Sequence, residues 1–141
     1  MTEGGADVRP AAPAERILVF RPGQLGDTLV SLPALAAIGK RRPDARLTLL
    51  TDAHPGKGFV SSWEILGPTG LFADVFFYEP GSGLTALARL ASRIRRLAAD
   101  RLYYLAPTPR TRSQVRRDRF FFQTLCGIQE ADGLAAAAPG P

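Results

Sequence analysis

Residues 17–35 read Ile-Leu-Val-Phe-Arg-Pro-Gly-Gln-Leu-Gly-Asp-Thr-Leu-Val-Ser-Leu-Pro-Ala-Leu, and this stretch decides the fold. Its opening apolar run is typical of a strand that is buried on both faces of a parallel sheet. Gly23 and Gly26 then permit a tight turn. Asp27 is a good helix N-cap, because its carboxylate can accept free backbone N–H groups. The sequence therefore predicts a strand, a tight turn and a helix that ends at about Arg42.

The predicted helix has apolar residues at helical spacing and one proline inside it. Its apolar positions are Leu29, Leu32, Leu35, Ala36 and Ile38. They predict that one side of the helix packs against the sheet. Pro33 lacks a backbone donor, so we expect a kink or a late helix start there.

Strands and helices alternate along the rest of the chain. The expected strands are residues 46–51, 73–78 and 101–105, and the expected helices are residues 59–66, 85–99 and 112–125. This alternation predicts a doubly wound, Rossmann-like α/β domain with a parallel sheet and helices on both faces. We expect the domain to cover residues 15–128 and to be incomplete, because its four strands leave an open sheet edge. It should lie between a flexible leader, residues 1–14, and a disordered tail, residues 129–141.

Length and composition exclude several classes of protein. The 141 residues suffice for one domain with a hydrophobic core. No apolar run approaches the ~20 residues that span a bilayer, and the first residues do not resemble a secretory signal. The single cysteine, Cys126, excludes an internal disulfide and fits a reducing cytoplasm. With one cysteine and one histidine, His54, we expect no metal site.

The net charge of +5 is unevenly distributed. Residues 89–119 contain ten arginines against Asp100 and Asp118, a local net charge of +8. Such asymmetry favours an anionic partner, such as a phosphorylated substrate, a membrane surface or nucleic acid, although solvated helix faces explain it equally well. Nucleic acid is the least favoured of these partners. The three consecutive phenylalanines, residues 120–122, would point in different directions on a helix and form no stacking platform.

The turn after the first strand lies where doubly wound sheets bind their ligands. Its pattern is G-x-x-G-D, which differs from the dinucleotide-binding G-x-G-x-x-G. Asp27 also places a negative charge where a pyrophosphate would otherwise bind the helix N-terminus. Asp52, at the end of the second strand, is the one feature that favours a ribose nearby. Two compatible interpretations fit Asp27: a helix cap, or a general base that takes a proton from an acceptor hydroxyl.

Residues 17–35 resemble the start of glycosyltransferase family 9, which contains the ADP-heptose:lipopolysaccharide heptosyltransferases. The shared pattern is a strand, an arginine, a short turn ending in Gly-Asp, and an apolar helix with an internal proline. Residues 41–47 also resemble the family's continuation into its second strand. The chain departs from the family at residues 22–24, Pro-Gly-Gln, where many relatives have small hydroxyl residues.

The resemblance implies a GT-B fold, of which this chain is part of the N-terminal, acceptor-side domain. It implies inverting transfer to a lipopolysaccharide core or another cell-envelope glycan, with Asp27 at the position of the proposed catalytic base. The candidate acceptor contacts are Arg21, Gly23, Gln24, Gly26, Thr28 and His54. A loop histidine such as His54 is more often simply solvated.

The resemblance also sets expectations about partners. A nucleotide-sugar donor would bind a C-terminal half that this chain lacks, so the chain would hold no cofactor and would not transfer sugar alone. We expect an anionic glycan or glycolipid acceptor, a separate C-terminal half, and peripheral contact with the inner face of a bacterial inner membrane. Two alternatives remain open: a non-catalytic nucleotide- or phosphate-binding Rossmann module, and an inactive remnant.

Overall fold

The computed structural model describes residues 14–22, 25–52, 62–79, 81, 83–105 and 111–132. Five strands in this part of the chain form one parallel sheet in the order β3-β2-β1-β4-β5. They are β1 (Arg16–Phe20), β2 (Arg46–Asp52), β3 (Asp74–Tyr78), β4 (Arg101–Tyr104) and β5 (Glu130–Asp132). The expected Rossmann-like α/β fold is therefore confirmed.

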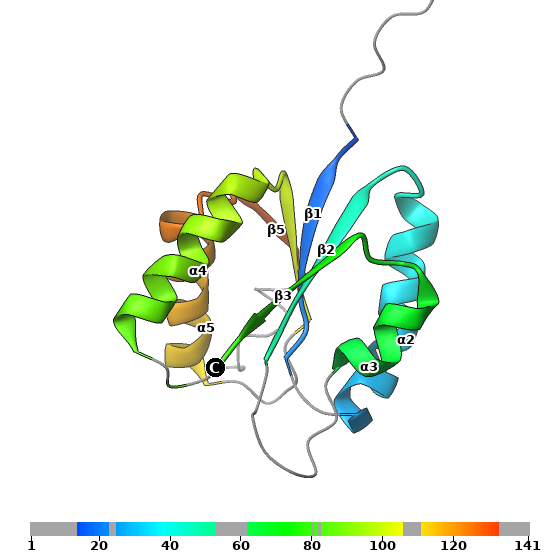
Figure 1. The fold of residues 1–141 in the computed structure, drawn as a ribbon, viewed down its shortest axis with the longest axis horizontal. Helices are drawn as coiled ribbons and strands as arrows, with labels where there is room; N and C mark the ends of the chain where they lie inside the picture. Colours follow the sequence, from blue (N-terminus) through cyan, green and yellow to red (C-terminus); the bar gives the residue numbers. More distant parts are fainter. Residues whose placement is uncertain are drawn as a thin grey trace, which may run out of the picture.

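Helices cover both faces of the sheet (Figure 1). One face carries α2 (Leu25–Arg41) and α3 (Ser62–Leu66), which is followed by the 3-10 turn η1 (Gly67–Thr69). The other face carries α4 (Leu84–Leu97) and α5 (Arg112–Arg119). The π-helix η2 (Phe120–Leu125) continues α5.

Alternation along the strands produces two separate cores. The core under α2 and α3 includes Ile17, Val19, Leu35, Ile38, Leu47, Leu49, Leu66 and Phe72. The core under α4 and α5 includes Leu18, Phe20, Leu50, Leu90, Ile94, Leu102, Phe122 and Ile128. Successive residues of β1 point into opposite cores, which explains why its sequence is continuously apolar.

Helix α2 differs from the expectation in its start and in its buried side. It begins at Leu25, so Asp27 lies at the third helical position and not at the N-cap, and Pro33 does not delay the start. Leu29 is 49% exposed, while Thr28 is buried in its place. The buried side of the helix thus includes Leu35 and Ile38 as expected, but at the N-terminal end it passes through Thr28 and not through Leu29.

The remaining corrections concern the C-terminal end of the described chain. Residues 130–132 form β5, which pairs with β4, and so do not belong to the disordered tail expected at 129–141. Three residues are too few for a periodic apolar signal, and β5 is held by its pairing with β4 instead. Gly127, at φ 76°, ends the last helix as expected. Residues 1–13 and 133–141 lie outside the described chain.

Candidate functional site at the carboxyl edge of the sheet

The parallel strands end together at one edge of the sheet, at the bottom of Figure 1. Arg21 follows β1, Asp52 ends β2, Tyr78 ends β3 and Tyr104 ends β4. The turn that leads into α2 leaves the sheet at this edge, between Arg21 and the helix start at Leu25. This is the position at which open α/β sheets bind ligands.

Arg21 is a buried arginine that links three elements. Only 2% of its surface is exposed. Its Nε donates to Ser31 Oγ at 3.1 Å, and its Nη1 donates to the carbonyl oxygens of Leu105, at 2.9 Å, and of Pro22. The guanidinium thus holds the turn after β1, the helix α2 and the end of β4 together. These contacts are those of a residue that stabilises the local structure.

The first turns of α2 are fixed by small hydroxyl residues. Thr28 is fully buried, and its carbonyl oxygen accepts a hydrogen bond from Ser31 Oγ at 2.8 Å. Because Ser31 also accepts from Arg21, the helix start and the turn share one hydrogen-bond network. The network fixes the backbone that carries Asp27.

The other candidate acceptor contacts are placed in part. Gly26 and Asp27 belong to the first turn of α2, beside the carboxyl ends of β1 and β2. Gly23, Gln24 and His54 lie outside the described residues. The structure therefore brings Arg21, Gly26, Asp27 and Thr28 to one edge of the sheet.

A second polar pair, Tyr104 and Asp118, lies at this edge and was not among the expected site residues. Tyr104 Oη donates to Asp118 Oδ2, and Asp118 is only 9% exposed. Arg117 Nε lies 3.7 Å from Asp118 Oδ1. Helical spacing could have revealed this carboxylate, because Asp118 follows the buried Val115 by three residues and so shares its side of α5. A buried carboxylate with a tyrosine partner fixes the end of β4 against α5.

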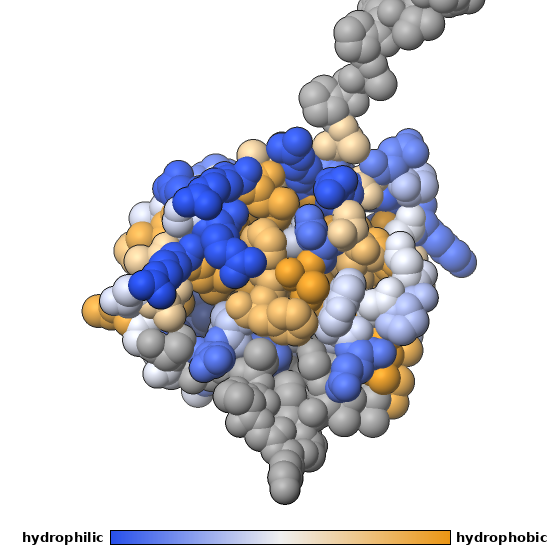
Figure 2. Space-filling model, in the orientation of Figure 1, coloured by the Kyte–Doolittle hydropathy of each residue, from blue (hydrophilic) through white to orange (hydrophobic). Residues whose placement is uncertain are grey.

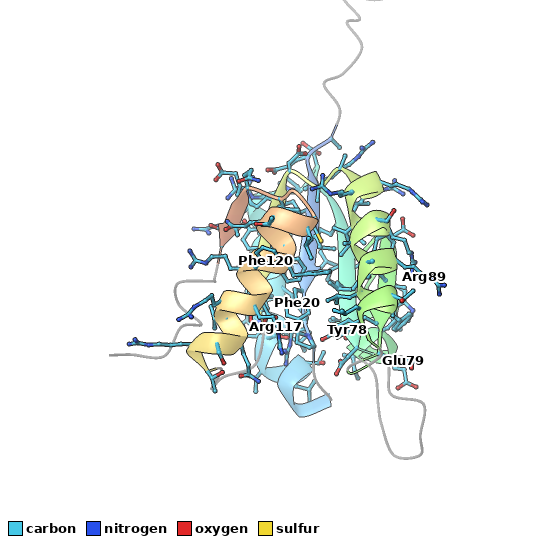
Figure 3. All side chains as sticks on the ribbon, turned by 90° about the vertical axis from the view of Figure 1, so that its left-hand side faces the viewer. Phe20, Tyr78, Glu79, Arg89, Arg117 and Phe120 are labelled. Carbon is cyan, nitrogen blue, oxygen red and sulfur yellow. The ribbon has the colours of Figure 1, made fainter. Side chains whose placement is uncertain are left out.

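Aromatic rings support the carboxyl edge from the side of α4 and α5 (Figure 3). The Phe20 ring centroid lies 5.1 Å from that of Phe122, 5.4 Å from that of Tyr104 and 6.0 Å from that of Tyr78. Tilted rings at these separations attract one another and pack densely. These contacts hold the ends of β1, β3 and β4 together on the side of α4 and α5.

The arginines of α4 and α5 are mostly exposed, as the solvated-face interpretation requires. Arg89, Arg93 and Arg96 all lie on the surface of α4. Arg95 instead donates to the carbonyl oxygens of Leu125, at 2.5 Å, and Thr124, at 3.0 Å, and so caps η2. In the described part of the chain, no three His, Cys, Asp or Glu residues come together to hold a metal.

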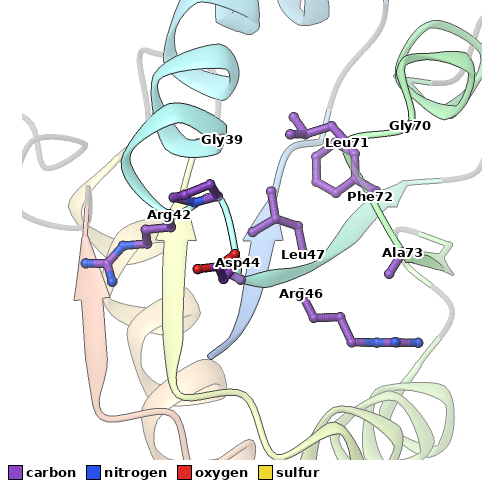
Figure 4. Close-up of a pocket in the computed structure, with 11 residues that line it drawn as sticks. Gly39, Arg42, Asp44, Arg46, Leu47, Gly70, Leu71, Phe72 and Ala73 are labelled. Atoms are coloured by element: carbon purple, nitrogen blue, oxygen red, sulfur yellow. The ribbon is translucent and has the colours of Figure 1, made fainter. Parts of the chain in front are cut away.

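A hollow of about 420 Å³ lies at the opposite, amino edge of the sheet (Figure 4). Its lining includes Gly39, Arg42, Arg46, Leu47 and Phe72. Arg42 donates to Tyr103 Oη and Glu15 Oε1, which raises the pKa of Arg42. Arg46 lies 3.6 Å from Asp74. Both guanidinium groups have partners outside the hollow, so we assign no ligand to it.

Comparison with known proteins shows a similarity of fold to one solved structure, but no similarity of sequence to a known family. No protein-family model matches the sequence, and no curated protein matches it. The crystal structure of the glycosyl transferase family 9 protein from Veillonella parvula DSM 2008 is similar, with a TM-score of 0.59 at 15% identity. The match covers 84% of this chain but 36% of that protein. The resemblance seen in the sequence therefore holds at the level of the fold, over a partial domain. Within the described segments, no helix is long and apolar enough to cross a membrane.

Proposed function

We propose that this chain is the acceptor-side part of an inverting glycosyltransferase. The acceptor would be a cell-envelope glycan, such as a lipopolysaccharide core, held at the carboxyl edge of the sheet. One observation carries the proposal: the Gly-Asp turn, whose sequence resembles family 9, opens α2 in a fold that is similar to a family 9 structure.

In the proposed reaction, Asp27 acts as the general base. It takes the proton of an acceptor hydroxyl while that oxygen attacks the anomeric carbon of the sugar. The bond to the nucleoside diphosphate breaks, and its electron pair leaves with the phosphate oxygen. Direct displacement inverts the anomeric centre without a covalent intermediate. The donor and the stabilisation of its leaving group would come from a C-terminal half.

The proposed acceptor is anionic, and the proposed location is the cytoplasmic side of a bacterial inner membrane. The exposed arginines of α4 and α5 support an anionic acceptor, because one guanidinium group can donate to two phosphate oxygens at once. An acceptor glycolipid would bring the protein into peripheral contact with the membrane.

A nucleotide- or phosphate-binding module without catalysis is the second candidate. The structure gives it one supporting observation, because Asp52 ends β2 next to the strand that enters the turn, where a ribose would lie. Against it stands the acidic residue in the first turn of α2, which opposes a phosphate at the helix N-terminus.

The two candidates differ in which ligand the turn binds. The test follows backbone amide signals of the ¹⁵N-labelled chain during titration with a phosphorylated, deacylated lipopolysaccharide-core oligosaccharide, and separately with ADP and NAD. The proposal expects the oligosaccharide to shift residues 20–29, and ADP and NAD to leave them unchanged. Shifts by ADP or NAD, made stronger by Asp27→Asn, would establish the nucleotide-binding module instead. The matched control is Asp44→Asn, which removes one carboxylate at the amino edge of the sheet.

A further inference from the structure

β3 forms one edge of the sheet and is less covered than β1, β2 and β4. All residues of β1 after the first are buried, whereas Val75, Phe76 and Tyr78 of β3 are half-buried. Phe77 is 41% exposed. In the described part of the chain β3 pairs only with β2, so its second side has no strand beside it. An uncovered strand of this composition is a template for another strand.

The register identifies which backbone groups point outward from β3. On β2, the Arg46 N–H donates to Glu15 and the Leu50 carbonyl accepts from Arg21, so the even-numbered residues of β2 face β1. Leu49 and Thr51 therefore face β3, opposite Val75 and Phe77. In a parallel ladder, a residue whose N–H and C=O groups both bond the neighbouring strand is paired with a residue whose own N–H and C=O groups point away from that strand. The N–H and C=O groups of Val75 and Phe77 thus point away from the sheet.

A row of arginines lies beside this edge. Arg89, Arg93 and Arg96 follow one side of α4 at helical spacing, and all three are exposed. Arg93 is held over the Phe76 ring, 4.6 Å from its centroid. In Figure 2 the row runs along α4 and borders the apolar surface over β3. Figure 3 shows Arg89 extending from α4 on the side away from α5.

These charges disfavour a second copy of the chain as the occupant. Antiparallel pairing of two β3 strands about a two-fold axis would place both α4 helices on the same face of a joint sheet. The two rows of arginines would then face each other across the joint, and like charges there repel. The one acidic residue of β3, Asp74, already lies 3.6 Å from Arg46.

We propose that the β3 edge binds an extended peptide segment in which acidic and apolar residues alternate. The segment would add a strand through the outward backbone groups of Val75 and Phe77. Its acidic side chains would lie on the face of α4 and meet Arg89, Arg93 and Arg96. Its apolar side chains would lie on the face of α3, beside Phe77, because alternate residues of a strand point to opposite faces. This inference does not rest on the proposed sugar transfer, although both proposals use the exposed arginines of α4.

The experiment uses three blocked seven-residue peptides and the full chain. The first peptide alternates glutamate with valine, the second replaces every glutamate by lysine, and the third has the residues of the first in two blocks. Binding is measured by fluorescence anisotropy, and amide hydrogen exchange reports which backbone groups gain protection. The proposal expects the alternating acidic peptide to bind more tightly than either control and to protect Val75 and Phe77. Equal binding of the acidic and lysine peptides would overturn it.

Two pairs of variants separate the contribution of strand addition at β3 from that of the arginine charges on α4. Phe77→Pro removes an outward N–H that the sheet does not use, and should abolish binding, whereas Phe77→Val should retain it. Arg89→Gln with Arg96→Gln should weaken binding about fivefold, as expected for two exposed ion pairs, and should weaken its dependence on salt. The matched control is Arg116→Gln with Arg119→Gln, an equal loss of charge on α5.

Two other outcomes would also overturn the proposal. If the unliganded chain forms dimers that Phe77→Pro dissociates, the edge is an interface between copies. If the peptide in two blocks binds as well as the alternating one, or if Phe77→Pro binds normally, the arginines attract acidic chains without strand addition. Circular dichroism of each variant checks that the fold is retained.

Discussion

The guanidinium of Arg21 donates to the carbonyl oxygen of Leu105 at 2.9 Å, and so joins the chain after β1 to the chain after β4. The backbone repeats this link next to it, because the Leu105 N–H donates to the Phe20 carbonyl at 2.9 Å. The two strands are therefore tied together at the carboxyl edge, next to the turn that carries the candidate base. Arg21, which the family resemblance suggests as an acceptor contact, is therefore also part of the scaffold.

Arg21→Met should lower the free energy of unfolding by about 3 kcal/mol, because it leaves buried carbonyl groups without their charged donor. Urea unfolding followed by circular dichroism measures this change. Arg46→Met is the control: its ion pair with Asp74 is half-exposed, so its loss should cost less than about 1 kcal/mol. Equal losses in the two variants would show that Arg21 does not hold the turn.

Tyr104→Phe should destabilise the protein by about 1–3 kcal/mol, because the buried Asp118 then loses its hydroxyl donor. Chemical unfolding of Tyr104→Phe, Asp118→Asn and the double variant forms a mutant cycle. A coupling energy near zero would show that the two side chains act independently.

Much of the fold could be predicted because β1 to β4 are short, largely apolar runs, and because α4 has a periodic apolar side. β5 could not, since three residues carry no period and β5 depends on its pairing with β4. The start of α2 was placed too late because Asp27 has the residue type of an N-cap, whereas the helix already begins at Leu25. Residue type predicts that a helix begins near Asp27, and packing decides where.

The candidate site was predicted in position and only partly in composition. A parallel sheet forces its ligand edge to the carboxyl ends of the strands, so the turn after β1 could be located. The burial of Arg21 could not, because an arginine after a strand is usually solvated and its partner Leu105 lies far away in the sequence. The spacing of Asp118 from Val115 indicates that it is buried, but the sequence does not reveal its contact with Tyr104.

Ala98→Gly should stabilise the protein by up to about 1 kcal/mol. Ala98 adopts φ 54° at the C-cap of α4, a left-handed conformation that glycine adopts without steric cost. Gly127→Ala should have the opposite effect, because Gly127 has φ 76° and a Cβ there would lie 3.2 Å from Arg95 Nη1. Thermal unfolding measures both, with Ala86→Gly inside α4 as a control that should destabilise. A destabilising Ala98→Gly would contradict the assigned helix end.

Cys126 should make stability fall at alkaline pH. Burial raises the pKa of its thiol from 9.0 to about 12, against the opposing effect of Arg95. A folded pKa above the unfolded value gives stability that is complete below pH 9.0 and is lost as pH rises toward about 12. Over that window the free energy of unfolding should fall by about 1 kcal/mol per pH unit more than in Cys126→Val. Urea unfolding at pH 8, 9.5 and 10.5 compares the two proteins, which share every other titrating group. Parallel curves would mean that the thiol ionises as readily in the folded chain as in the unfolded one.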